Sequence, residues 1–130
     1  MLTAGALGAG IGSSIAAESK VMLSGSQEVP SVSTSAAGDG AITVGSDRSV
    51  SGSLTTSGIM GISAHIHEAA EGKNGPVIIP LTKTSDGVWS VPAGAKLTEA
   101  QYKSYEAGDL YINVHSEEYK SGEIRAQMKP

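Results

Sequence analysis

Short runs in which apolar and polar residues alternate, separated by glycine-rich turns, recur along most of this 130-residue chain. Two such runs are Gly40–Val44 and Ser49–Thr55, with the turn signal Gly45–Asp47 between them. Alternation with a period of two places every second side chain on the same face of a β-strand. The two runs therefore predict a β-hairpin whose aliphatic side chains face a core.

The same pattern predicts about eight strands and one short helix. The other strands are expected at Lys20–Leu23, Ile62–His67, Val77–Leu81, Val88–Val91, Leu110–His115 and Glu123–Met128. The helix is expected over Thr98–Glu106, because Thr98 and Gln101 form a capping-box pattern and Gly108 is a stop signal. Many short strands joined by turns predict an all-β fold, a Greek-key sandwich or barrel.

Composition limits both the core and the function. Phe and Cys are absent and Trp89 is the single tryptophan, so Val, Ile, Leu, Met and Tyr must supply the core. Without Cys the chain has no disulfide and no thiolate metal site. A net charge of −4 argues against nucleic acid as a partner, since nucleic-acid binding needs a basic surface. Neither a nucleophile elbow nor a phosphate-binding loop is present.

Residues 1–19 differ from the β-domain expected over residues 20–130. The stretch Met1–Ala17 is apolar, uncharged and rich in small residues, and its end resembles the small-x-small pattern before a signal-peptidase cut. It is too short and too glycine-rich for a good membrane span. We expect an export-signal remnant, or otherwise a flexible tail or a packing segment. An export signal implies a periplasmic or secreted protein with no membrane span in its mature form.

All three histidines lie on predicted strands. His65 and His67 are two residues apart, so they project from the same face, and His115 projects with Tyr111 and Asn113. The intervening aliphatic residues point to the core, which places the imidazoles on the outside. If the two strands are neighbours in register, the rings converge. Three neutral imidazoles suit Cu, Zn, Fe or Ni, copper binds tightest, and one coordination position stays open.

The residues alone leave two readings open, a metal site or surface histidines without a common ligand. The last strand adds Arg125, which should share the polar face and would attract small anions. Met60 and Met128 are expected to pack in the core rather than to act as soft copper ligands. The candidate hydrogen-bonding partners of the histidines are Asn113, Glu68, Glu117 and Glu123.

Three segments resemble the CHRD domain, a family named after chordin. They are Leu23–Pro30 (LSGSQEVP), Ala64–Leu81 (AHIHEAAEGKNGPVIIPL) and Leu97–Met128, which contains the NVH and GEIR motifs. The resemblance covers nearly everything after the signal-like segment. It implies a short exported protein with an immunoglobulin-like Greek-key β-sandwich or barrel, similar in layout to copper–zinc superoxide dismutase.

The resemblance also implies roles for single residues. By position, His65 and His67 are similar to the first copper-ligand pair of that enzyme, His115 to its late copper ligand, and Arg125 to its anion-guiding arginine. The histidine that bridges copper and zinc, the zinc loop and the disulfide have no counterpart here. The resemblance therefore implies a copper-only site without zinc. Glu68 also departs from the pattern, since family members typically have Gly after the His-x-His.

Three functions follow as hypotheses. The first is copper-only superoxide dismutase activity, with superoxide as the small-anion partner and Arg125 as a catalytic residue. The second is copper storage or delivery without turnover. The third is a metal-free extracellular interaction module. An open strand edge would in addition permit a homodimer.

Overall fold

The structure is a computed structural model, and it describes residues 16–130. These residues form one antiparallel sheet of nine strands in the order β6-β5-β9-β10-β2-β3-β4-β8-β7, with one α-helix and a short 3₁₀ turn. The strands are β2 (Ala17–Ser24), β3 (Ala37–Val44), β4 (Val50–Ser57), β5 (Gly61–Glu68), β6 (Val77–Pro80), β7 (Thr82–Ser85), β8 (Val88–Ser90), β9 (Leu110–Ser116) and β10 (Ile124–Met128). The helices are η2 (Gly25–Gln27) and α1 (Glu99–Glu106). The predicted all-β class with one short helix is confirmed.

The first described strand begins at Ala17, three residues before the expected start. Most of the export-signal prediction for residues 1–19 concerns residues 1–15, which lie outside the described part of the chain. Within residues 16–130, no helix is long and apolar enough to cross a membrane.

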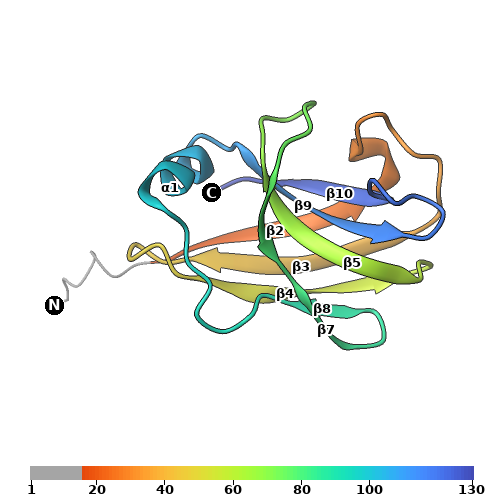
Figure 1. The fold of residues 1–130 in the computed structure, drawn as a ribbon, viewed down its shortest axis with the longest axis horizontal. Coiled ribbons are helices and arrows are strands. Elements are labelled where there is room, and N and C mark those ends of the chain that lie inside the picture. The colour runs from red at the N-terminus through yellow and green to blue at the C-terminus, as the bar shows by residue number, and fades with distance from the viewer. Residues whose placement is uncertain (1–15) are drawn as a thin grey trace, which may run out of the picture.

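The sheet curls into a nearly closed barrel because one segment joins its two ends (Figure 1). The strands β6 and β7 stand at opposite ends of the strand order, yet only Leu81 separates them in the chain. β6 pairs with β5, and β7 pairs with β8. Leu81 N donates a hydrogen bond of 2.9 Å to Ala64 O, so this segment is tied to β5 at the point where it crosses. β7 was not predicted, because all four of its side chains are exposed and none is apolar.

Alternate side chains of the strands fill the barrel. The predicted hairpin is β3–β4, with Val44 opposite Val50, and both residues are buried. Trp89 on β8 and Met128 on β10 are also buried in the core. The core prediction for Met60 is wrong: it is 89% exposed, in the turn between β4 and β5. That turn lies at one end of the barrel, where no strand packs over it.

The helix α1 fits its sequence signals and leads into β9. The Thr98 hydroxyl accepts from Gln101 N at 3.1 Å, and the Gln101 side chain accepts from Thr98 N at 2.9 Å, which completes the capping box. Gly108, with a φ of +81°, takes the left-handed conformation that ends a helix at low cost for glycine. β9 starts two residues later.

Strand order and register bring the predicted site residues together. β5 and β10 flank β9, so Asn113 lies opposite His65 on one side and opposite Arg125 on the other. Ile66 on β5 and Ile112 and Val114 on β9 point into the barrel and are fully buried. The polar residues of these three strands therefore share the outer face, as the alternation predicts.

We predict that Gly52→Ala destabilises the protein by about 3 kcal/mol. Gly52 has a φ of +131°, and a Cβ there would press on the backbone of β3 at Ala41 O, so backbone strain and overpacking act together. Gly94→Ala is the matched control, because Gly94 also has a positive φ, +84°, but open space around it. It should cost about 1 kcal/mol. Urea denaturation of both variants measures the difference, and equal losses would contradict the close approach of β3 and β4.

Candidate metal centre

The three imidazoles meet on the outer face of β5 and β9. Their ring centroids lie 4.7 Å (His65–His115), 5.5 Å (His65–His67) and 5.9 Å (His67–His115) apart. One nitrogen from each ring lies within 4.8 Å of the others. The convergence predicted from the sequence is confirmed, and the three histidines can form a metal site.

Two backbone carbonyls fix which nitrogen of two rings is free. Gly75 O lies 2.9 Å from Nδ1 of His67, and Lys120 O lies 2.8 Å from Nδ1 of His115. A carbonyl oxygen only accepts, so each Nδ1 carries the proton and each Nε2 keeps its lone pair in the neutral ring. Histidines that bind metals are commonly oriented in this way, by a hydrogen bond from the ring nitrogen that does not bind the ion.

His65 presents Nδ1 to this pair. Its Nδ1 lies 3.0 Å from Nε2 of His115, and since that Nε2 has no proton, His65 Nδ1 is the donor in the metal-free protein. A bound ion would require this proton to move to Nε2 of the same half-exposed ring. The nitrogens that would bind the ion are then Nδ1 of His65, Nε2 of His67 and Nε2 of His115.

The spacing and an unpartnered atom fit a metal ion. A nitrogen separation of 3.0 Å suits two ligands at about 2.0–2.1 Å from one ion, and one nitrogen of each ring lies within 4.8 Å of the others, so a small shift of the side chains would bring all three to that distance. Nε2 of His67 is buried and has no hydrogen-bond partner. Leaving such an atom unsatisfied costs about 1–3 kcal/mol. A metal ion at this point would satisfy it.

Burial keeps the rings of His65 and His67 neutral by lowering the pKa of each. Burial lowers the pKa of His65 to about 4, with smaller contributions from the neighbouring His115 and His67. Burial also lowers the pKa of His67, although its hydrogen bond to Gly75 O and the neighbouring Asn113 side chain act in the opposite direction. Neutral imidazole is the metal-binding form, so these two lone pairs are available at neutral pH without competition from protons.

Arg125 lies behind the histidines rather than over the metal position. Its guanidinium carbon lies 3.4 Å from the Tyr111 ring centroid. Tyr111 also stacks on His67, with ring centroids 4.6 Å apart and an interplanar angle of 5°. Arg125 is 1% exposed and donates to Asn74 Oδ1 at 3.1 Å and to Lys73 O at 2.7 Å. The arginine therefore shares the polar face, as predicted, but reaches the site through its charge rather than through an open approach.

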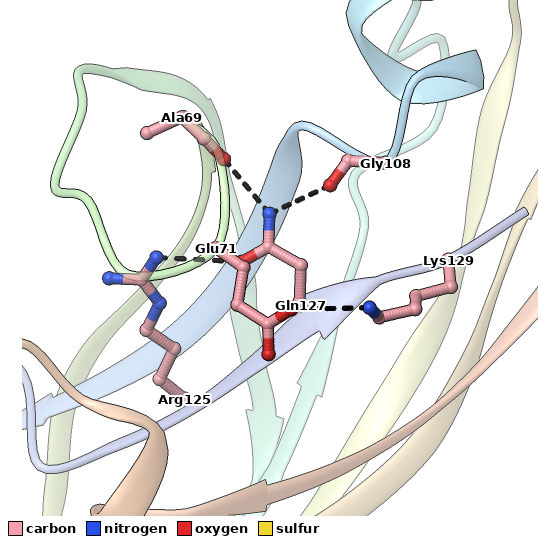
Figure 2. Close-up of polar contacts among 6 residues, drawn as sticks. All are labelled: Ala69, Glu71, Gly108, Arg125, Gln127 and Lys129. Carbon is pink, nitrogen blue, oxygen red and sulfur yellow. Dashed lines mark hydrogen bonds and ion pairs between the residues drawn. The ribbon is translucent and has the colours of Figure 1, made fainter.

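The loop between β5 and β6, residues 69–76, is held against the outer face by Arg125 and Gln127, both on β10. Gln127 Nε2 donates 2.9 Å bonds to Ala69 O in the loop and to Gly108 O after α1, as Figure 2 shows. Lys129 forms an exposed ion pair with Glu71 at 3.3 Å. The same loop supplies Gly75 O to His67, so the cover also fixes a ligand.

On the other side of Asn113 lies a buried carboxyl that the sequence analysis missed. Glu28, just after η2, accepts from Asn113 Nδ2 at 3.4 Å, and a Cβ on Gly122 would overlap both groups. Burial raises the pKa of Glu28 to about 7, while Asn113 and the charge of Arg125 act to lower it. No local pattern identifies Glu28, because 85 residues separate it from its partner in the chain.

The predicted carboxylate partners of the histidines have other contacts. Glu123 accepts from Ser116 and Thr34, both at 2.6 Å, and Glu117 contacts Lys120 at 3.7 Å on the surface. Asn113 lies beside the rings, and its Oδ1 is buried without a hydrogen-bond partner. Within the described residues, backbone carbonyls orient two of the rings, and of the predicted side chains Asn113 acts on a ring, since it raises the pKa of His67.

The fold and site define an all-β barrel protein with a three-histidine cluster on its outer face. A comparison with known families gives the family: the CHRD domain model matches residues 19–128, and the chain belongs to that family. No curated protein and no solved structure matches the chain.

We predict that Glu28→Gln removes a pH-dependent loss of stability. A carboxyl whose pKa is higher in the folded than in the unfolded protein favours folding while protonated, and this contribution disappears as pH rises from about 4.5 through 7. The metal-free wild type should therefore lose about 2 kcal/mol relative to Glu28→Gln between pH 4 and pH 8. Urea denaturation across this range measures the difference. The exposed Glu117→Gln should follow the wild type, and a constant gap between wild type and Glu28→Gln would contradict the burial of an ionisable carboxyl.

Proposed function

We propose that this protein binds one copper ion at His65, His67 and His115 and uses it to dismutate superoxide. The observation that carries the proposal is the convergence of three imidazole nitrogens, two of them with lone pairs aimed by backbone carbonyls. Among divalent first-row ions, copper binds such nitrogen sites most tightly. When bound, copper would supply one-electron transfer to and from the substrate.

Three features of the chain support a small anionic substrate. His65 is partly exposed while the other two ligands are buried, so the ion would be reached from the His65 side. These histidines line none of the pockets of about 650, 230 and 320 Å³ in the described part of the chain, and a site outside those pockets suits a small substrate better than a large organic one. The buried charge of Arg125 lies close enough to act on His67 and would favour an anion.

Copper storage or delivery without turnover is the second candidate, and one observation favours it. Arg125 is covered by the loop and bonded to Lys73 O and Asn74, so its guanidinium does not contact an anion at the metal position. A carrier needs the same three ligands but no open coordination position. We also propose that the protein works outside the cytoplasm, on the basis of the signal-like residues 1–17.

We predict that the wild type binds Cu(II) at a ratio of one, and that His115→Ala lowers the affinity by about two orders of magnitude or more. Removing one of three ligands leaves a two-nitrogen site of much lower affinity. Competition with a chromophoric chelator measures the affinity. Glu117→Ala, an exposed change two residues away, is the matched control and should bind like the wild type. Equal binding by His115→Ala would place copper elsewhere.

We predict that the copper-loaded wild type dismutates superoxide well above the rate of His115→Ala with the same copper added. Azide should perturb the Cu(II) electron paramagnetic resonance spectrum of the wild type, because an open position accepts an anion. Tight copper binding with no activity and no azide effect would reject dismutation in favour of storage. Absence of copper binding would reject both.

A further inference from the structure

The nearly closed barrel has a gap in its hydrogen-bonded strand pairing, between β5 and β7, which we call the seam. The ladder between β5 and β6 ends at His65–Pro80, and after the Leu81 N to Ala64 O bond the chain diverges from β5. Within residues 16–130, no ladder joins β7 to β5, and β7 pairs only with β8. Strand β7 therefore presents a free edge at the seam, and its four residues are all exposed. Free strand edges are the sites where extended peptides add to a sheet.

A pocket of about 650 Å³ lies in this seam, at the end of the barrel away from α1. Trp89 and Gly61 line it from inside, and the exposed Met60 and Ile62 stand at its rim. Met60 is 89% and Ile62 49% exposed, which makes them two of only four large exposed hydrophobic residues in the described chain. An apolar floor beside a free edge offers both backbone bonds and side-chain contacts to an extended chain.

The charge of the lining selects one kind of partner. Asp86, Glu117, Glu118 and Glu123 line the pocket, against one cation, Lys83, whose ammonium lies 5.8 Å from the Trp89 ring centroid. Glu123 is buried and satisfied by Ser116 and Thr34, and Glu117 is paired with Lys120 at 3.7 Å. Asp86 and Glu118 are exposed. The accessible rim is therefore acidic and complementary to basic side chains.

We propose that this seam binds an extended peptide segment with alternating apolar and basic side chains, which adds to the edge of β7. The alternation follows from strand geometry: apolar side chains on one face would enter the pocket, and basic ones on the other would meet the acidic rim. None of the three histidines lines the pocket, but the loop after β9 supplies Glu117 and Glu118 to the pocket and Lys120 O to His115, so the peptide site is tested on the metal-free protein.

The single tryptophan gives a direct readout. Trp89 lines the pocket, so a peptide bound there should change its fluorescence in a saturable way. The probe is an acetylated and amidated heptapeptide of alternating valine and lysine, titrated into the full metal-free protein. We expect saturable binding that weakens as salt rises, and no binding of the valine–glutamate peptide. No saturable change with the valine–lysine peptide, or equal binding of both peptides, would overturn the proposal.

Two further measurements test the charge and the strand addition separately. Glu118→Lys should weaken the valine–lysine peptide about tenfold, while Glu106→Lys, the same change on α1 outside the pocket, should leave it unaltered. A peptide N-methylated at every second residue cannot pair along one edge and should lose binding. If Glu106→Lys weakens binding as much as Glu118→Lys, the site is not at the seam. Undiminished binding of the methylated peptide would reject addition to β7.

Discussion

Two hydrogen bonds from imidazole to backbone carbonyl set the chemistry of the outer face. Gly75 O and Lys120 O each hold the Nδ1 proton of one histidine, and so leave the opposite nitrogens of His67 and His115 as lone pairs pointing to a common place. The carbonyls come from two different loops, one before β6 and one after β9. The ligand set therefore depends on how these loops fold over the barrel as much as on the strands that carry the histidines.

The outer face is a second, polar layer packed against the barrel. Arg125, Tyr111 and Asn113 are nearly as buried as the aliphatic core, yet they face away from it. Within the described residues no carboxylate lies within ion-pair distance of Arg125, so its charge is compensated by carbonyl and amide oxygens and by the Tyr111 ring. Burying a charge is costly unless such partners are in place. The covering loop lowers this cost, because Lys73 O and Asn74 accept hydrogen bonds from Arg125.

Sequence alone predicted the part of the site that depends on local periodicity. The period-two rule placed His65 and His67 on one face, and the same rule put His115 and Arg125 on it once their strands proved adjacent. It did not predict β7, where polar residues form a strand because β8 supplies the ladder. It also missed Glu28 and the carbonyl partners of the histidines, since those contacts join distant segments and carry no local signal. The prediction that Met60 packs in the core was wrong for a related reason: hydrophobicity alone does not say which residues of a turn stay exposed.

In the proposed centre one copper ion is shared by three imidazole rings. Anomalous diffraction from a crystal of the copper-loaded protein tests this coordination most directly. Data collected on both sides of the copper absorption edge should show one strong peak, about 2.0–2.1 Å from Nδ1 of His65 and from Nε2 of His67 and of His115. A peak bound by fewer than three of these nitrogens, or no peak on this face, would contradict the proposed centre.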